Sequence, residues 1–377
     1  MELLSGDGGS PTTPCLRASR DARIQNKPKN ELSGDFIVKR RLIHGKLHLA
    51  EASGNEGCQA KLEEVHPHEQ VSMQRPTPHG SKLKELVSNS KLPSGDIPAV
   101  ETALKTYDQW IKSMASLTST GQQKIKDLVD LLNAYKRHIE VDLIWDSKND
   151  FIYRQKGQIK LDNSIIEEFL PWLIDDAIIA GIDNANIITG PHSAFASSYF
   201  TGSLTTGDTK PGLRIRAKDQ DFTIGKQVFM AASFDKAFSP STTDVQSVAL
   251  AYIAAECKTN LDKTMFQEAT ATAHDLKIAA PASRYFLLCE FLDMRPISTA
   301  GSDIAEVLIL RGKRINSNLR KDFSNADNRV KQRAEYVEFL DKNPVRFDVI
   351  QRFVNHITAV FNKVDPDESD VVAKGYF

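Results

Sequence analysis

Two charged residues lie at the end of a run that the sequence predicts to be a buried strand. Residues 247–257 are apolar on both faces, and Glu256 and Lys258 stand two positions apart where the run ends. Because side chains alternate along a strand, Glu256 and Lys258 share one face. Charged groups that face a core are costly unless they are paired or bound to something. The two residues therefore indicate either an ion pair or a site for a metal and a phosphate.

Two aspartates on an earlier predicted strand share a face in the same way. Asp219 and Asp221 lie in the alternating run 213–224, so neighbouring strands would bring an aspartate to Glu256. Two close carboxylates repel each other unless a cation lies between them, and such oxygen ligands favour Mg²⁺ or Mn²⁺. Lys258 beside that metal could hold a water in line with a phosphorus and neutralise developing charge. This set of residues is typical of phosphodiester hydrolysis, and a surface ion pair is the alternative.

The same residues resemble the core of the PD-(D/E)xK nucleases, in which an Asp on one strand and a Glu-x-Lys on the next form the active site. Here Asp221 and Glu256-Cys257-Lys258 match that pattern. The longer stretch 256–277 is similar to type II restriction endonucleases of the Bpu10I-like family, which cut a short asymmetric DNA sequence. The likeness extends over about residues 79–313, which is most of the chain beyond its N-terminal stretch.

The resemblance implies a role for each matching residue. Asp221 and Glu256 would be metal ligands, Lys258 the catalytic lysine and Mg²⁺ the cofactor. The family's Pro-Asp pair is absent, because residues 218–221 read Lys-Asp-Gln-Asp. Asp221 is the favoured metal ligand because it directly precedes the apolar part of the strand, and Asp219 is the alternative.

The resemblance also implies the reaction and the partners. The substrate would be double-stranded DNA, cut at a short specific sequence to leave 5′-phosphate and 3′-hydroxyl ends. Cutting both strands needs two active sites, so a homodimer or a heterodimer with a related subunit is expected. A methyltransferase would protect the same sequence. The alternatives are a non-catalytic DNA-binding protein of this fold, with Glu256 and Lys258 merely paired, and a repair or mobile-element nuclease with little sequence preference.

Two further groups of residues are candidates for the same function. Glu167, next to Glu168 in a predicted helix, could supply an extra acidic ligand, although such a pair in a first turn also complements the helix dipole. A basic run near the C-terminus is interspersed with asparagines, and Arg and Asn pair with base edges while basic residues contact phosphates. Arg314, Arg320 and Lys321 are its predicted DNA-binding members, with a solvated helix face as the alternative. The run consists of Arg311, Lys313, Arg314, Arg320, Lys321, Arg329, Lys331 and Arg333.

The elements that must position these residues follow from hydrophobic periodicity and from Gly, Pro and capping residues. Helices are predicted from about 97 to 111, 121 to 145, 162 to 181, 259 to 276 and 314 to 361. Strands are predicted at 213–224, 228–234, 247–257, 285–291 and 307–310. This order indicates a mixed α/β (α+β) fold. The resemblance implies a restriction-endonuclease-like mixed sheet flanked by helices, with added N- and C-terminal helices.

Composition divides the chain into four parts. Residues 1–95 are rich in Gly, Ser, Pro, His and charge and are expected to be low-complexity and mostly disordered, apart from a short hairpin at 36–50. Residues 96–189 form the helical N-terminal part of the core, 190–312 the catalytic sheet, and 313–377 a C-terminal helical region with the basic run and a tail. Translation could begin at Met73, so residues 1–72 are predicted to be dispensable.

Length, charge and cysteine usage are those of an ordinary globular protein. The chain has 377 residues, 41% hydrophobic residues and a net charge of −1, so it is not a uniformly basic nucleic-acid binder. Its cysteines form no CxxC pair and suggest neither a zinc site nor a disulfide framework. No signal core or apolar run of about 18 residues appears, so no membrane segment is predicted and the cytoplasm is the expected location. The cysteines are Cys15, Cys58, Cys257 and Cys289.

Overall fold

The computed structural model describes residues 75–182, 186–204, 207–314 and 323–362, together with Ser369 and Val372. The predicted hairpin at 36–50 and the predicted dispensable segment 1–72 lie outside the described residues. Within the described ranges, no helix is both long and apolar enough to cross a membrane.

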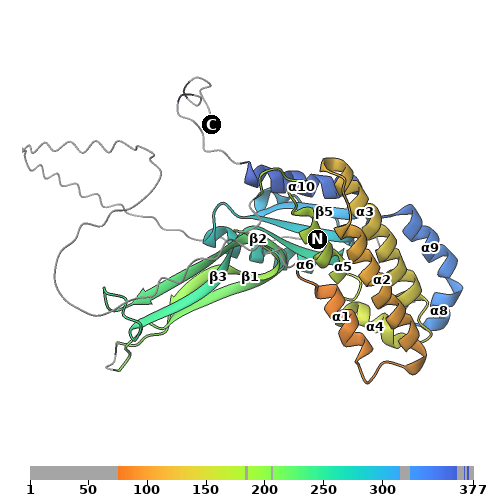
Figure 1. Ribbon diagram of the computed structural model, residues 1–377, viewed down its shortest axis with the longest axis horizontal. Coiled ribbons are helices and arrows are strands. Elements are labelled where there is room, and N and C mark those ends of the chain that lie inside the picture. Colours follow the sequence, from red (N-terminus) through yellow and green to blue (C-terminus); the bar gives the residue numbers. More distant parts are fainter. Residues whose placement is uncertain are drawn as a thin grey trace, which may run out of the picture. The chain divides into compact units, whose positions relative to one another are not determined.

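A group of helices precedes the sheet (Figure 1). In chain order they are α1 (Pro78–Val87), η1 (Ser94–Asp96), α2 (Ile97–Ala115), α3 (Gly121–His138), the π-helix η2 (Ile139–Trp145), α4 (Asp150–Gln158), α5 (Ser164–Phe169) and η3 (Leu170–Leu173). Helices α2 and α3 lie where periodicity places them. The prediction of disorder up to residue 95 is wrong for α1, whose Leu83 and Leu86 are buried. The predicted helix to 181 ends as an α-helix at Phe169, because Pro171 has no N–H to continue it.

The five strands form one mixed sheet in the order β1-β2-β3-β4-β5. They are β1 (Ile188–Phe200), β2 (Leu213–Ser233), β3 (Thr243–Leu261), β4 (Arg284–Leu292) and β5 (Ile304–Arg314). Strand β2 pairs antiparallel with β1 and with β3. Strand β4 pairs parallel with β3 and with β5. The parallel step from β3 to β4 is made by helix α6 (Lys263–Ala279), as a crossover requires. The expected mixed sheet flanked by helices is confirmed.

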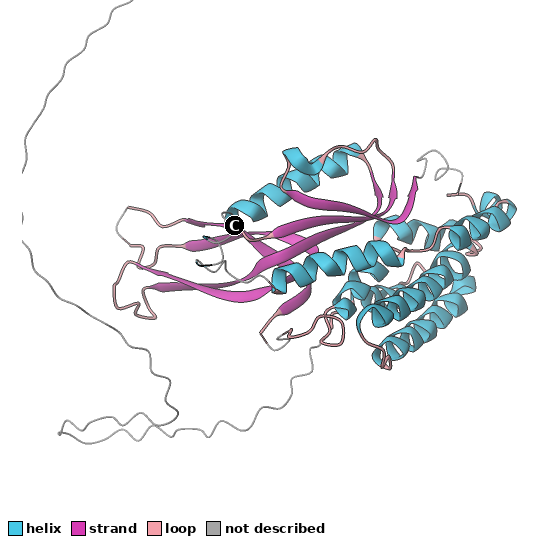
Figure 2. Cartoon of the chain, turned by 90° about the horizontal axis from the view of Figure 1, so that it is seen from above, coloured by secondary structure: helices cyan, strands magenta, loops and turns pink. Residues whose placement is uncertain are grey.

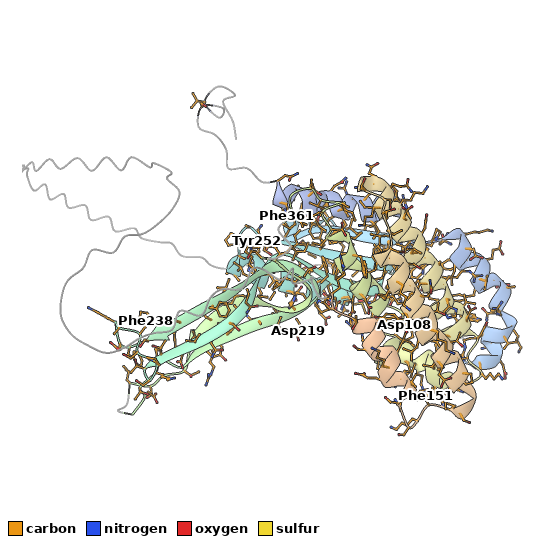
Figure 3. The ribbon with its side chains drawn as sticks, viewed as in Figure 1. Asp108, Phe151, Asp219, Phe238, Tyr252 and Phe361 are labelled. Atoms are coloured by element: carbon orange, nitrogen blue, oxygen red, sulfur yellow. The ribbon has the colours of Figure 1, made fainter. Side chains whose placement is uncertain are left out.

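Strand β2 is longer than the sequence predicts, because two predicted strands join into one. An irregularity in its pairing with β3 falls between Ile224 and Gly225. A Cβ on Gly225 would lie 2.3 Å from the carbonyl oxygen of Leu250, so only glycine allows the two backbones to approach this closely. Strands β1 to β3 run out together beyond the helices as a β-arm (Figure 1), with Phe238 toward its free end and Asp219 nearer the helices (Figure 3).

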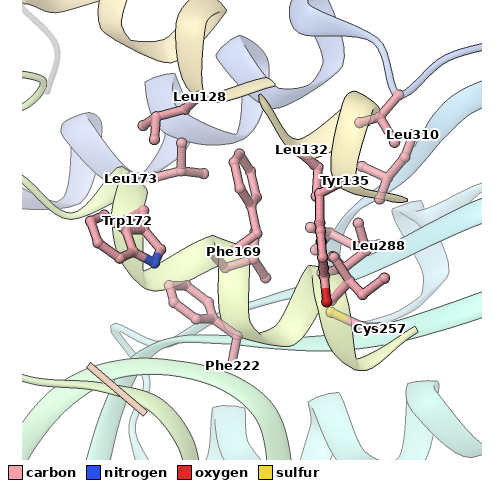
Figure 4. Packing of buried hydrophobic residues seen from close by; sticks show 14 of the residues in the cluster. Leu128, Leu132, Tyr135, Phe169, Trp172, Leu173, Phe222, Cys257, Leu288 and Leu310 are labelled. Carbon is pink, nitrogen blue, oxygen red and sulfur yellow. The ribbon is translucent and has the colours of Figure 1, made fainter. Parts of the chain in front are cut away.

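Helices cover both faces of the sheet (Figure 2) and enclose two apolar clusters. The larger cluster joins residues of α3 and α5 to residues of β2, β3 and β4, and Figure 4 shows Phe169 near Phe222 and Tyr135 near Cys257. The smaller cluster lies under α6 and includes Ala254 and Tyr285. Helix α5 contacts β1 and shares the larger apolar cluster with β2 and β3, so a polar residue on α5 can approach Asp221.

Described residues 326–361 are mainly helical, as predicted, but the predicted start near 314 is wrong because Arg314 still belongs to β5. The region contains α8 (Ala326–Lys331), α9 (Arg333–Lys342) and α10 (Phe347–Phe361). Helix α10 packs against α3 and β5, burying Ile350, Phe353 and Ile357. The region therefore completes the larger apolar cluster.

Candidate active site

Strand pairing brings Asp221 to Glu256. Phe222 on β2 is opposite Ala255 on the antiparallel β3, which places Asp221 across from Glu256. The carboxylate of Asp221 also accepts a hydrogen bond at its Oδ2 from the backbone N–H of Cys257, at 2.8 Å. Cys257 itself is 1% exposed and faces the core, as its position between two charged residues predicts. Asp221 is thus fixed at the junction of the two strands.

Glu256 and Lys258 form an ion pair, which is one of the two arrangements that the sequence indicates. The Nζ of Lys258 lies 2.5 Å from Oε1 of Glu256, and the hydroxyl of Tyr285 on β4 donates to Oε2 at 2.8 Å. The two charged side chains are 22% and 27% exposed, so the pair can be reached from solvent. The hydrogen bond from Tyr285 holds the carboxylate of Glu256 in one orientation, on the residue that lies across from Asp221.

Helix α5 contributes a third carboxylate to the same place. Lys160 lies between Asp221 and Glu167: its Nζ is 3.0 Å from Oδ1 of Asp221 and 3.6 Å from Oε1 of Glu167. Burial and then the charge of Asp221 raise the pKa of Glu167, so the two carboxylates sense each other. Lys82 on α1 approaches Oε2 of Glu167 at 3.8 Å. The extra acidic residue predicted from the sequence therefore lies beside Asp221.

Glu168 faces a different element. Its Oε2 accepts hydrogen bonds from the backbone N–H groups of His79, at 2.8 Å, and Gly80, at 3.0 Å, in the first turn of α1. Its Oε1 accepts a hydrogen bond of 2.5 Å from the hydroxyl of Tyr107 on α2. His79 is fully buried, which, with the nearby lysines, lowers its pKa to about 3 and keeps it neutral. Glu168 holds α1 in place, whereas Glu167 faces the lysines.

Asp219 is bonded to the opposite neighbour of β2, strand β1, and not to β3. It is exposed, pairs with Ser193 of β1 and accepts a hydrogen bond of 2.5 Å from the Ser193 hydroxyl. Of the two aspartates, Asp221 is the one whose carboxylate contacts β3 and Lys160.

Three of the residues around these carboxylates carry no signal in the sequence. Lys82 lies on the unpredicted helix α1, and Tyr285 lies within a predicted strand without any indication that its hydroxyl reaches Glu256. Lys160 follows α4, in a segment for which no helix was predicted, and adopts a φ of +54°. Only the tertiary arrangement brings these three residues to the site.

A second, fully buried group of acids has a structural explanation. Among the described residues, Glu140, Asp162 and Glu290 are the one group of three possible metal-ligating residues with ligand atoms within 4.8 Å of one another. Three basic residues already neutralise them. The ion pairs are Lys136 with Glu140 at 3.0 Å and with Glu290 at 2.8 Å, Arg311 with Glu140 at 2.7 Å and with Glu290 at 2.9 Å, and Lys156 with Asp162 at 3.1 Å. This buried ion network joins α3, η2, β4 and β5.

The basic run is not a single surface. Arg311 belongs to the buried ion network, and Arg329 is fully buried, donating to the backbone carbonyls of Trp145 and Ser147. Both were wrongly grouped with DNA-facing residues, because sequence alone does not distinguish a buried arginine from an exposed one. Arg314, at the end of β5, is exposed. Arg320 and Lys321 lie outside the described residues.

Asp221, Glu167 and Glu256 offer the donor chemistry of a divalent-cation site, but in this structure, with Lys160 between the first two, the ligand atoms of the three do not all lie within 4.8 Å of one another. All three ligands are carboxylates, the hard oxygen donors that Mg²⁺ and Mn²⁺ select. The Oε1 of Glu167 is buried and accepts no hydrogen bond, and the ammonium of Lys160, 3.6 Å away, is the positive charge that faces it. Lys258 lies next to these ligands and is accessible to a polyanionic substrate.

A protein family and a solved structure are similar to this chain. A family model described as "Bpu10I restriction endonuclease" matches residues 158–377, which include Glu167, Asp221, Glu256 and Lys258. A chain of the solved structure "native BbvCI A2B2 tetramer at low resolution" is similar at 21% identity and a TM-score of 0.45, covering 71% of this chain and 97% of that one. Comparison with curated protein sequences found no match. Since the family model covers more than half of the chain, this protein belongs to the Bpu10I restriction endonuclease family.

Proposed function

We propose that this protein is a type II restriction endonuclease that cleaves double-stranded DNA at a short specific sequence, in the cytoplasm, by Mg²⁺-dependent hydrolysis of phosphodiester bonds. The observation that supports it most is the junction of β2 and β3. There Asp221 and Glu256 face each other across the antiparallel pair, with Lys258 on the same strand as Glu256. This is the arrangement of the PD-(D/E)xK pattern, which the sequence resembles.

Each residue has a distinct task in this mechanism. Asp221, Glu256 and Glu167 would hold Mg²⁺, which when bound lowers the pKa of a water and offsets the charge of a phosphate. The ammonium of Lys258 donates hydrogen bonds to the attacking water or to a phosphate oxygen, and neutralises charge that develops there. Tyr285 keeps the carboxylate of Glu256 in one orientation through its hydrogen bond. The backbone N–H of Cys257 does the same for Asp221.

The DNA contacts and partners are part of the same proposal. Arg314 is exposed at the end of β5 and is positioned in sequence to act with Arg320 and Lys321 on backbone phosphates. Cleavage of both strands requires two sites, so we propose a homodimer or a heterodimer with a related subunit, and a cognate methyltransferase. Exposed aromatic side chains on the β-arm support association with another protein surface. They are Phe229, Phe234 and Phe238, each more than half exposed.

The test is cleavage of plasmid DNA in Mg²⁺ by wild-type protein and matched variants. We expect wild type to give discrete fragments with 5′-phosphate ends. Asp221→Asn and Lys258→Met should lower the rate by about 100-fold or more. Asp219→Asn should retain at least partial activity, because the Asp219 carboxylate is hydrogen-bonded to Ser193 of β1. DNA binding should persist in all three variants.

Other outcomes would change specific parts of the proposal. Loss of activity in Asp219→Asn but not in Asp221→Asn would move the metal ligand to Asp219. Cleavage without discrete fragments would favour a repair or mobile-element nuclease. Specific DNA binding without cleavage by the wild type would favour a non-catalytic protein in which Glu256 and Lys258 are merely paired.

A further inference from the structure

Lys160 occupies the space between two carboxylates of the site. Its Nζ is 3.0 Å from Oδ1 of Asp221 and 3.6 Å from Oε1 of Glu167. These are the oxygens left over after Asp221 Oδ2 has accepted the Cys257 N–H and Glu167 Oε2 has approached Lys82. An ammonium that bridges the free oxygens of two carboxylates stands where a shared cation would stand.

The other two lysines do not have this position. Lys82 lies 3.8 Å from Oε2 of Glu167, and Lys258 pairs with Glu256. Among the ion pairs of the described residues, Lys160 is the lysine that contacts both Asp221 and Glu167. Its role is therefore distinct from that of the predicted catalytic lysine, Lys258.

The backbone at Lys160 is strained in a way that keeps the side chain at the site. Lys160 has a φ of +54° just after the end of α4, where glycine is the usual residue. The turn is closed by the Leu161 N–H, which donates to the carbonyl of Gln155 at 3.3 Å. Non-glycine residues with such a strained backbone are concentrated at functional sites, so the φ of Lys160 supports a role for its side chain.

The Lys160 side chain can also leave. It is 47% exposed, whereas the Glu167 and Asp221 side chains that it joins are 7% and 17% exposed. Rotation about its flexible stem would move the ammonium into water without unpacking the core. The carboxylates would remain, fixed by α5 and by β2.

We propose that Lys160 is an internal counter-ion that occupies the cation position between Asp221 and Glu167 and is displaced when a divalent cation binds there. This inference rests on the proposed metal site. Lys160 thereby keeps the two carboxylates together in the absence of metal and competes with the metal for them. It is a positioning residue that sets the metal concentration that the protein requires.

The test is Mn²⁺ binding to the full chain by calorimetry, without DNA, so that the readout is independent of cleavage. Lys160→Met removes the ammonium while keeping a side chain of similar length and the same backbone strain. We expect it to bind Mn²⁺ about tenfold more tightly than wild type, because the competing charge is gone. Lys126→Met removes one exposed positive charge from α3 and should leave the affinity within about twofold.

Two further variants keep the test decisive. Lys160→Gly removes both the ammonium and the strain, so it should fold even if Lys160→Met does not, and it should also bind Mn²⁺ more tightly. Asp221→Asn should weaken binding, which separates the two proposals. If Asp221→Asn has no effect, the metal site itself is wrong. If Asp221→Asn weakens binding but neither Lys160 variant tightens it, the metal site stands and the role of Lys160 is overturned.

Discussion

Two adjacent glutamates of α5 show how one residue step changes a role. Glu167 faces Lys160 and Asp221, while Glu168 accepts the first N–H groups of α1. The sequence raised both possibilities for the pair, an extra metal ligand and a partner for helix N–H groups. The structure places Glu167 beside Lys160 and Asp221, where its role as a ligand stays a prediction, and it places Glu168 on the N–H groups of α1 and not at the dipole of α5 itself.

Conservative substitutions should separate the two glutamates. Glu167→Gln should weaken Mn²⁺ binding and cleavage with little loss of stability, because burial and Asp221 already disfavour its charge. Glu168→Gln should lower the free energy of unfolding by about 1–3 kcal/mol, since an amide cannot accept all three hydrogen bonds. Urea unfolding and plasmid cleavage measure the two effects. Equal loss of stability in both variants would contradict this division.

Sequence reasoning at the residue scale succeeded where a fixed period applies. Alternation along a strand placed Glu256 and Lys258 together, because a strand leaves only two possible directions for a side chain. Asp221 was favoured over Asp219, which shares its face, because it directly precedes the apolar part of the strand, and its carboxylate does contact β3. Lys160 is 61 residues from Asp221. Its position depends on how α4 ends and how α5 packs, which no local period encodes.

At the scale of elements, strand β1 was not predicted because its composition is that of a loop. Strand β1 contains Gly190, Pro191 and several Ser and Thr residues, yet it pairs with β2 along its length. As an edge strand it can accommodate a proline that an inner strand would exclude. Helix α1 was missed because its surroundings are polar, although its buried leucines are held by α2. The elements with strong apolar periods, such as α2, α3 and β3, were predicted correctly.

The basic run contains both buried and exposed residues, and two arginines of β5 allow the two kinds to be compared. Arg311 is buried and Arg314 is exposed. Arg311→Met should lower the free energy of unfolding by about 3–5 kcal/mol, because it leaves Glu140 and Glu290 with an uncompensated buried charge. Arg314→Met should leave stability unchanged and reduce the salt dependence of DNA binding by about one unit of slope. Urea unfolding and binding titrations at several salt concentrations test both. An unchanged slope for Arg314→Met would identify its position as a solvated face.

At the scale of the whole molecule, the described contacts begin at Arg75. Its guanidinium lies 4.3 Å from the ring centroid of Trp172 and 3.8 Å from the carboxylate of Asp175. These contacts join the start of the described chain to the segment that follows α5. The boundary predicted from composition, Met73, lies just before them.

A chain that starts at Met73 should therefore keep every contact of the described part. We expect it to unfold at the same temperature as the full chain and to cleave DNA at the same sequence. The comparison requires thermal unfolding and fragment analysis of both chains. A matched chain starting at Leu83 would lose the first half of α1 and the hydrogen bonds from His79 and Gly80 to Glu168, so it should be destabilised. Loss of sequence-specific cleavage in the Met73 chain would show that residues 1–72 belong to the working enzyme.

The pairing of charges at the site has a consequence for the order in which DNA and a divalent cation bind. Three carboxylates, from Glu167, Asp221 and Glu256, meet three ammonium groups, from Lys82, Lys160 and Lys258. Without a divalent ion the site is therefore locally neutral and offers no net repulsion to a DNA backbone. Duplex can settle against it first, and the later arrival of a cation would free ammonium groups beside the phosphates. Such a protein can search DNA in an inactive state and become competent only at the moment the ion enters.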